Sequence, residues 1–145
     1  MTTILVLNGP NLSRLGSREP DVYGSTTWDQ LVESLNAAAT SAEVVSVRQT
    51  NDESELIGWL HEALDARAEV ILNPAAFTHY SYALRDAVAM LTGAGISVVE
   101  VHISNPHARE EFRHTSVISG VATGVIAGFG TQSYHLALAA LRSRR

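Results

Sequence analysis

The chain of 145 residues contains neither cysteine nor lysine, and all ten of its basic residues are arginine. Without cysteine there is no disulfide, no thiolate nucleophile and no thiolate metal ligand. Without lysine, a lysine Schiff base and the lysine of a phosphate-binding P-loop are both excluded. Any chemistry must therefore depend on histidine, tyrosine, carboxylate, amide and arginine side chains.

The sequence also lacks a membrane-spanning stretch and a charge balance that suits nucleic acid. No apolar run reaches the roughly 20 residues needed to cross a bilayer. The start, Met1-Thr2-Thr3, lacks the basic segment of a secretory signal. A net charge of -5 is the opposite of the basic face that nucleic-acid binding requires. We therefore expect a cytoplasmic protein with no membrane or nucleic-acid partner.

What is present is the composition of an ordinary globular chain, with 46% hydrophobic and 17% charged residues. This length favours a single domain, residues 1–145. Strands are expected at Ile4–Leu7, Val44–Gln49, Val70–Leu72, Ile96–His102 and Val121–Ala127, and helices after Thr27, after Asp52, at Ala83–Leu91 and from Tyr134. Strands that alternate with helices predict an α/β fold, a doubly wound parallel sheet of five strands covered on both faces.

The stretch Asn8–Gly24 follows the first strand and has the composition of an active-site loop. Its turn-forming residues are Gly9, Pro10, Gly16, Pro20 and Gly24. These residues are expected to deny it regular structure. A loop of this length in a compact domain is usually a lid or disordered. We expect a mobile lid over about residues 12–24, and a solvated connector with incidental arginines is the alternative.

In a doubly wound sheet, ligands bind beyond the carboxyl ends of the strands. The polar side chains near three predicted strand ends are Asn8 and Asn11, then Asn73 and His79, and then Glu100, His102, Ser104, Arg109 and Arg113. Three strand ends that each supply hydrogen-bonding groups to one rim predict a binding site there.

Simpler structural roles remain open for these residues. His79 precedes a helix and could cap it, whereas Glu100 and His102 share one face of a strand and could be a structural pair. Asp86 lies in a helix, where a carboxylate is more often solvated, and Arg109–Arg113 could be a salt-bridged surface turn. The histidines are too scattered for a metal site with its supporting contacts, so no metal is expected.

The glycine-rich stretch Gly120–Gly130 invites a nucleotide-binding interpretation. It misses the third glycine of the dinucleotide fingerprint, and no acidic residue follows at the required distance. A tightly packed last strand before a helix is the prediction instead.

Five linked motifs run in order over nearly the whole chain. They are Asn8–Gly24, Asn73–His79, Ala83–Asp86, Glu100–Asn105 and Arg109–Arg113. Together they resemble the type II 3-dehydroquinate dehydratase family. The resemblance implies a flavodoxin-like subunit of a dodecamer that works without a cofactor in the shikimate pathway. The implied reaction is anti elimination of water from 3-dehydroquinate, through an enolate, to 3-dehydroshikimate.

The resemblance also implies a role for each site residue. Tyr23 would be the base, His102 the acid, Arg18 the residue that stabilises the transition state, and Asn11 the holder of a water at the enolate oxygen. The residues implied to bind the substrate are Asn73, His79, Asp86, Arg113 and the backbone of Ile103 and Ser104. That Glu100 orients His102 is inferred from their two-residue spacing. The sequence departs from the usual family pattern beside the site, at Ser13, Arg14, Ala75 and Tyr80.

Two other classes of function remain possible from the sequence. One is a flavodoxin-like module that binds a nucleotide or a flavin, and the other is a catalytically silent assembly subunit. Neither explains why Tyr23, Arg18 and His102 occur together.

Overall fold

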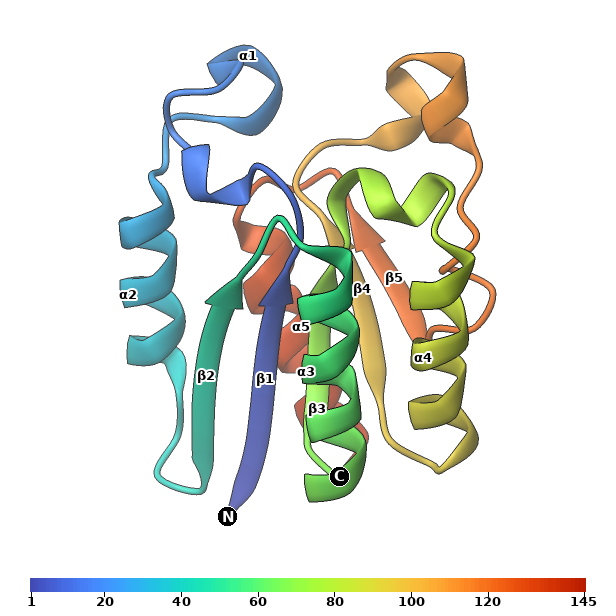
Figure 1. Ribbon diagram of the computed structural model, residues 1–145. Helices are drawn as coiled ribbons and strands as arrows, with labels where there is room; N and C mark the ends of the chain where they lie inside the picture. The colour runs from blue at the N-terminus through green and yellow to red at the C-terminus, as the bar shows by residue number, and fades with distance from the viewer.

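In the computed structural model, which describes residues 1–145, the strands form one parallel sheet in the order β2-β1-β3-β4-β5 (Figure 1). The strands are β1 (Thr2–Asn8), β2 (Glu43–Gln49), β3 (Glu69–Asn73), β4 (Val98–His102) and β5 (Gly124–Ala127). The chain first adds β2 on one side of β1 and then crosses to build β3, β4 and β5 on the other. The direction of winding therefore changes between β1 and β3, and a crevice at their carboxyl ends follows from that change. The predicted five-stranded parallel sheet is confirmed.

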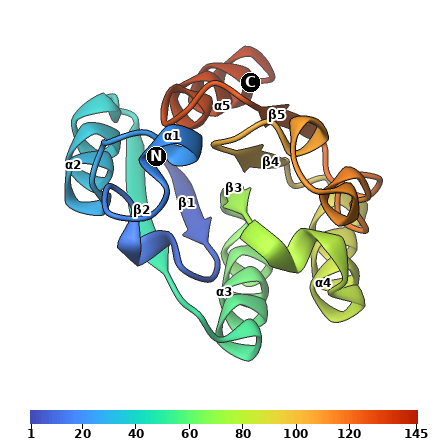
Figure 2. The same cartoon turned by 90° about the horizontal axis from the view of Figure 1, so that it is seen from above.

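Helices cover both faces of the sheet. They are α1 (Pro20–Tyr23), α2 (Trp28–Ala38), α3 (Glu53–Ala66), α4 (Tyr82–Gly93) and α5 (Gln132–Ser143), with short 3-10 turns η1 (Leu12–Arg14), η2 (Ala75–His79), η3 (Pro106–Ala108) and η4 (Glu111–His114). Seen from above, α3 and α4 lie on one side of the sheet, and α2 and α5 lie on the other (Figure 2). No helix is both long and apolar enough to traverse a bilayer.

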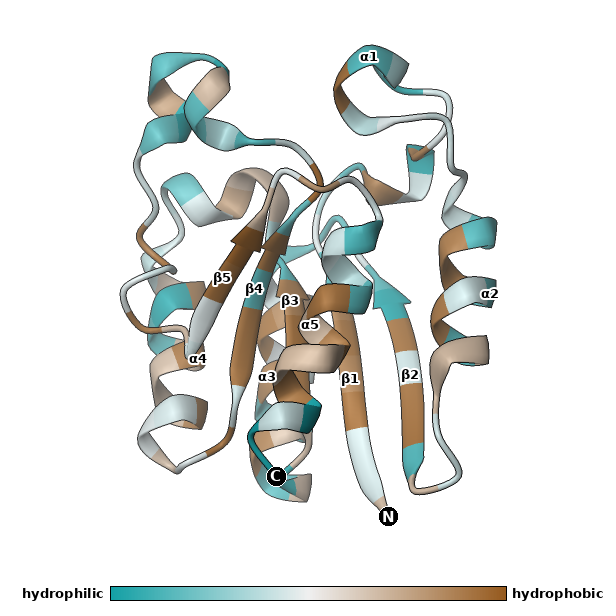
Figure 3. Ribbon diagram, turned by 180° about the vertical axis from the view of Figure 1, so that it is seen from behind, coloured by the Kyte–Doolittle hydropathy of each residue, from teal (hydrophilic) through white to brown (hydrophobic).

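The central strand β1 serves two hydrophobic cores. Leu5 and Leu7 belong to the core under α3 and α4, whereas Ile4 and Val6 belong to the core under α2 and α5. This alternation follows from the two-residue period of a strand, and it explains why β1 is apolar without interruption. Apolar residues accordingly fill the middle of the strands, and polar residues dominate the loops above their carboxyl ends (Figure 3).

Helix starts carry the signals expected of them. The Thr27 hydroxyl accepts a hydrogen bond from the Gln30 backbone N–H, and the Gln30 side chain accepts one from the Thr27 N–H. These two hydrogen bonds form a capping box at the start of α2, the helix predicted to follow Thr27. Ser81 caps α4 in a similar way, through the Leu84 N–H.

Two strands begin later than predicted, β4 at Val98 and β5 at Gly124. The backbone N–H groups of Val121 and Ala122 both bond to the carbonyl of Ile118, which keeps that segment in a turn. The prediction of a tightly packed last strand is wrong. β5 lies at the edge of the sheet with Val125 47% exposed, and a side chain at Gly124 would meet no atom within 4 Å.

The predicted lid contains more regular structure than its glycines and prolines suggested. It folds into the turn η1 and the single-turn helix α1, which stand above the carboxyl ends of the strands (Figure 1). Pro20 was interpreted as a breaker, but it occupies the first turn of α1, where its missing N–H has no intrahelical partner to lose. The loop is therefore structured around Tyr23, the last residue of that helix.

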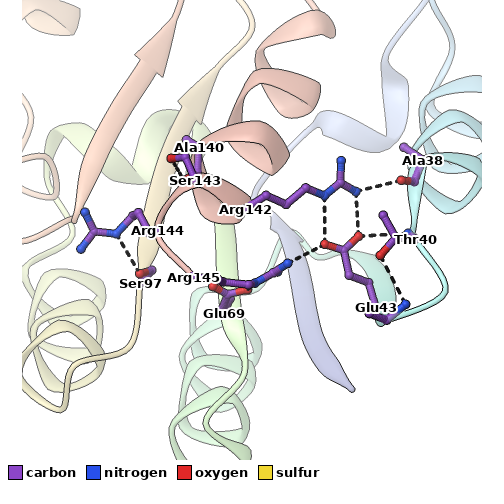
Figure 4. A network of polar contacts seen from close by, with 11 residues as sticks. Ala38, Thr40, Glu43, Glu69, Ser97, Ala140, Arg142, Ser143, Arg144 and Arg145 are labelled. Carbon is purple, nitrogen blue, oxygen red and sulfur yellow. Dashed lines mark hydrogen bonds and ion pairs between the residues drawn. The ribbon is translucent and has the colours of Figure 1, made fainter.

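At the opposite end of the sheet, an ion-pair cluster closes the fold. Glu43 begins β2 with its side chain 1% exposed, and it accepts hydrogen bonds from Arg142 and Arg145 at distances of 2.7 to 2.9 Å (Figure 4). Arg145 also pairs with Glu69 of β3. The hydrogen bonds from Arg142, opposed by burial and assisted by Arg145, hold the pKa of Glu43 far below its ordinary value. We refer to Glu43, Glu69, Arg142 and Arg145 as the C-terminal clasp.

Candidate active site

A cavity lies above the carboxyl ends of β1, β3 and β4, under the lid. Its walls are Pro10, Asn11, Leu12, Arg18, Tyr23, Asn73, Ala75, Ala76, His79, His102, Ile103, Ser104, Pro106, Arg109 and Arg113. Nine of the eleven site residues expected from the sequence are among them, Glu100 lies directly behind His102, and Asp86 is elsewhere. The structure therefore brings together residues that are spread over three strand ends and the lid.

The cavity is cationic although the protein as a whole is not. Arg18, Arg109 and Arg113 line it, and no aspartate or glutamate does. The whole chain carries a net charge of -5. Glu110, outside the lining, lies near both Arg109 and Arg113, at 3.8 and 3.1 Å. Three guanidinium groups in a wall that contains no carboxylate favour an anionic ligand, because guanidinium groups bind carboxylates and phosphates through charge-assisted hydrogen bonds.

The start of the Asn8–Gly24 loop is held in place by a close approach between its backbone at Gly9 and the backbone of Pro74. A side-chain carbon at Gly9 would lie 2.7 Å from the carbonyl oxygen of Pro74, so only glycine fits there. The next loop residue but one, Asn11, has a left-handed backbone (φ 71°), and its N–H donates to the Asn51 side chain at 2.9 Å. The Asn11 side chain is thereby held at the cavity wall, which it lines.

Tyr23 is flanked by two guanidinium groups. The central guanidinium carbon of Arg18 lies 4.6 Å from the centre of the tyrosine ring, and that of Arg109 lies 5.1 Å from it. Arg109 also donates to the Ser104 hydroxyl at 3.1 Å, which ties the lid contact to the end of β4. Positive charge is therefore concentrated beside the Tyr23 ring. The sequence placed Arg109 near the site but gave it no role, because its contact with Tyr23 depends on the folded lid.

The imidazole of His102 rests on a buried carboxylate. Its Nε2 lies 2.5 Å from Oε2 of Glu100, whose side chain is fully buried. Thr78 and Ser119 each donate a hydroxyl to Glu100 at 2.7 Å. Burial alone would raise the pKa of Glu100, but the hydrogen bonds from His102, Thr78 and Ser119 outweigh it and lower that pKa. The carboxylate is therefore ionised and accepts from Nε2, which leaves Nδ1 as the nitrogen of His102 that can exchange a proton.

His79 is held in one tautomer. Its Nδ1 lies 2.8 Å from the carbonyl oxygen of Thr115, and a carbonyl can only accept, so Nδ1 carries the hydrogen and Nε2 a lone pair. Burial lowers the pKa of His79 despite that hydrogen bond. The neutral ring therefore presents an acceptor to the cavity. The capping alternative is wrong, because Ser81 caps the following helix.

The remaining expected residues fall into two groups. Arg113 lines the cavity and also pairs with Glu110 at 3.1 Å, so the salt-bridged turn and the binding role coexist there. Asp86 does not reach the cavity of its own chain. Its side chain is 75% exposed on α4, and its partner is the adjacent Arg85. The solvated alternative holds for Asp86 within one chain.

No three histidine, aspartate or glutamate side chains are grouped as metal ligands. Thr78 and Ser119, which hold the carboxylate of Glu100, were missed from the sequence. Thr78 lies within the Asn73–His79 motif, but Ser119 sits in a glycine-flanked turn that carries no local signal.

Comparisons with known proteins agree with this geometry. The family model described as dehydroquinase class II matches residues 2–142. The 3-dehydroquinate dehydratase of Salinispora tropica is 57% identical over 142 residues, which cover 97% of each chain. That of Mycobacteroides abscessus is 61% identical over 137 residues, covering 94% of this chain and 93% of the relative. The crystal structure of the type II dehydroquinase from Propionibacterium acnes superposes with a TM-score of 0.93 at 50% identity, covering 99% of this chain and 97% of the other. The chain belongs to the class II dehydroquinase family.

Proposed function

We propose that this cavity catalyses the anti elimination of water from 3-dehydroquinate, giving 3-dehydroshikimate, and that the reaction passes through an enolate. The enzyme is then a hydro-lyase of the shikimate pathway that needs no cofactor. The observation that carries this proposal is the pairing, in one cationic cavity, of a tyrosine flanked by guanidinium groups with a histidine held by a buried carboxylate.

The first step is removal of the proton next to the ketone. Tyr23 is the base in this proposal, and the guanidinium groups of Arg18 and Arg109 lie beside its ring. The electrons of the C–H bond move to the ketone oxygen and give the enolate. Asn11, fixed at the cavity wall by its backbone contact, would hold a water that donates to this developing negative charge.

The second step is loss of the β-hydroxyl. As the enolate collapses, the C–O bond breaks and the leaving oxygen takes the Nδ1 proton of His102, so that water departs. Glu100 stabilises the imidazolium before the transfer and fixes the ring through Nε2. The proton gained by Tyr23 then returns to His102 through solvent, which restores both groups for the next turnover. General acid catalysis of this kind contributes about 10²–10⁴-fold.

Recognition of the substrate uses the remaining lining residues. Arg113 is suited to the substrate carboxylate, and the neutral His79 offers Nε2 as an acceptor to a substrate hydroxyl. Asn73 and the backbone of Ile103 and Ser104 complete the contacts in the proposal. The lid residues Arg18 and Tyr23 close over the bound molecule and exclude water.

We also propose that the enzyme works as a homo-oligomer, a dodecamer by the family resemblance. Asp86 is exposed on α4, so its expected contact with substrate requires the cavity of a neighbouring subunit. Tyr82, one helical turn before it and hence on the same face of α4, is 69% exposed. An exposed aromatic ring, next to a carboxylate that does not reach the cavity of its own chain, is consistent with a helix face that meets a second copy.

No observation favours the flavin- or nucleotide-binding alternative. Its sequence motif is absent, and the glycine-rich segment forms an edge strand and the turn before α5.

The test is a direct assay of the purified protein with 3-dehydroquinate, followed by the ultraviolet absorbance of the conjugated enone product. We expect turnover by the native chain and none by Tyr23→Phe. Size-exclusion chromatography with light scattering on the same sample gives the subunit number. A native protein that is folded and oligomeric but forms no enone would contradict the proposal and favour the silent assembly subunit.

A further inference from the structure

Three polar side chains meet beneath the cavity and are almost completely withdrawn from solvent. They are Asn8 at the end of β1, Asn73 at the end of β3 and Tyr134 in the first turn of α5, with exposures of 0%, 3% and 0%. The Tyr134 hydroxyl lies 2.6 Å from Oδ1 of Asn8 and 2.8 Å from Nδ2 of Asn73. Of the three, only Asn73 also lines the cavity.

Neighbouring backbone groups fix the orientation of the two side-chain amides, those of Asn8 and Asn73. The Asn8 amide faces the carbonyl oxygen of Arg48 at 3.1 Å, and a carbonyl can only accept, so Nδ2 of Asn8 points there and Oδ1 points to Tyr134. At the other end, the backbone N–H of Ala75 lies 3.0 Å from the Asn73 side chain. An N–H can only donate, so Oδ1 of Asn73 points to Ala75 and Nδ2 points to Tyr134.

The orientation of the Tyr134 hydroxyl between these two amides is therefore also fixed. Burial raises the pKa of Tyr134 far above its ordinary value, so the hydroxyl keeps its proton at any working pH. That proton goes to Oδ1 of Asn8, and the oxygen accepts from Nδ2 of Asn73. If the Asn73 amide turned over, its oxygen would face the tyrosine oxygen and its NH2 would face an N–H, which leaves two buried contacts between like groups.

We propose that Tyr134 is a positioning residue of the dehydration reaction, which holds the amide of Asn73 so that Asn73 presents an N–H, and not an oxygen, to an acceptor oxygen of the substrate. One hydrogen of Asn73 Nδ2 is used by Tyr134, and the second is left for a ligand in the cavity that Asn73 lines. The inference rests on the proposed function, because it assumes that the cavity binds 3-dehydroquinate.

The test is a double-mutant cycle on kcat/KM for 3-dehydroquinate. Tyr134→Phe deletes only the hydroxyl, and we expect kcat/KM to fall about tenfold, the factor expected when one hydrogen bond to a bound substrate is lost. In a chain that already carries Asn73→Ala, the same change should alter kcat/KM less than twofold, because the amide that Tyr134 positions is gone. A purely structural role of the hydroxyl would lower kcat/KM by the same factor in both backgrounds, and that result would overturn the proposal.

Ser133→Ala is the matched control. Ser133 is the neighbouring residue of α5, is equally buried, and uses its hydroxyl to accept from the Phe129 backbone N–H at 3.3 Å without touching Asn73. Its loss should leave kcat/KM within twofold of native. A native chain without turnover would instead contradict the proposed function. An active native chain whose kcat/KM does not change with Tyr134→Phe would contradict only the positioning role of Tyr134.

A crystal structure of the native protein with bound product provides a check that does not depend on how the variant folds. We expect Tyr134 Oη to bridge Asn8 and Asn73 in that complex, and Asn73 Nδ2 to lie within hydrogen-bond distance of a product oxygen. An Asn73 amide turned away from Tyr134 would overturn the proposal.

Discussion

Glu100 and His102 stand two residues apart on β4, and an oxygen of the first lies 2.5 Å from Nε2 of the second. The sequence spacing predicted that they share one face of the strand. The structure adds that the carboxylate is fully buried and accepts three hydrogen bonds, one from His102 and two from hydroxyl groups. The carboxylate therefore orients the His102 ring through Nε2 and leaves Nδ1 as the nitrogen that can exchange a proton.

Replacing Glu100 with glutamine should lower kcat about 10²-fold, within the range of general acid catalysis, with little change in KM. The amide keeps the shape but offers His102 no negative charge. Enone formation measures the effect, and Glu111→Gln, on an exposed turn away from the cavity lining, is the control. A variant with native kcat would show that the carboxylate serves only the stability of β4.

Replacing Arg18 with glutamine should lower kcat by about 10²–10³-fold, the loss typical when one group that stabilises developing charge is removed. The guanidinium carbon of Arg18 lies 4.6 Å from the centre of the Tyr23 ring at the cavity wall, and glutamine keeps hydrogen bonding but removes that charge. Enone formation measures the effect, with Tyr23→Phe expected to be inactive and Arg67→Gln, a surface arginine bonded to the Ala94 carbonyl, expected to behave as native. Native kcat in Arg18→Gln would show that this charge has no part in the reaction.

Sodium borohydride added together with 3-dehydroquinate should neither inactivate the enzyme nor leave a covalent adduct. The chain has no lysine, so a Schiff base with the ketone could form only at the amine of Met1, at the opposite end of the sheet from the cavity (Figure 1). Mass spectrometry and residual activity measure the outcome. Substrate-dependent inactivation would refute the enolate route.

Replacing Ala75 with glycine should stabilise the protein by about 0.5–1 kcal/mol. Ala75 has a left-handed backbone with φ 51°. A side chain in that conformation costs roughly 1–2 kcal/mol, more than the 0.4–1 kcal/mol or so that glycine adds to the entropy of the unfolded chain. Urea unfolding measures the change. Ala37→Gly, on the exposed side of α2, should shift stability in the opposite direction, and destabilisation by Ala75→Gly would contradict the strain argument.

Because of the C-terminal clasp, the free energy of unfolding should decrease at acid pH. The pKa of Glu43 is lowered in the folded protein, mainly by hydrogen bonds from Arg142. Its stabilising contribution is therefore complete above the ordinary glutamate pKa of about 4.3 and is lost as pH falls through the lower folded value. Glu43→Gln should cost about 1–3 kcal/mol at pH 7, with a difference from native that shrinks on acidification. Thermal unfolding across pH measures it, with Glu33→Gln, an exposed glutamate of α2, as control. A pH-independent difference would contradict the clasp.

The sheet could be predicted from the sequence because its signals are local. The apolar run of β1 and the capping box at Thr27 each depend on residues a few positions apart. The site followed from the sheet, since parallel strands bring their carboxyl ends to one edge. What could not be predicted depends on contacts between distant segments. Tyr134 meets Asn8 from 126 positions away, and no local pattern distinguishes it from an ordinary buried ring.

The lid and Asp86 show two further limits. A proline can either end a helix or occupy its first turn, and the sequence around Pro20 did not distinguish the two. In the folded protein Pro20 occupies the first turn of α1. Asp86 lies in one of the family motifs, but it is 75% exposed on α4 and does not line the cavity of its own chain. Sequence reasoning placed it among the substrate contacts without indicating whose substrate it would touch.

Helix α5 joins the two ends of the molecule. Its first turn carries Tyr134 beneath the cavity, and its last turn carries Arg142 of the C-terminal clasp at the far edge of the sheet, about 12 Å away at 1.5 Å per residue. A rigid helix anchored at both ends transmits a shift at one end to the other. Trimming the chain after Leu141 would remove Arg142 and Arg145, and with them the contacts that anchor the last turn of the helix that carries Tyr134.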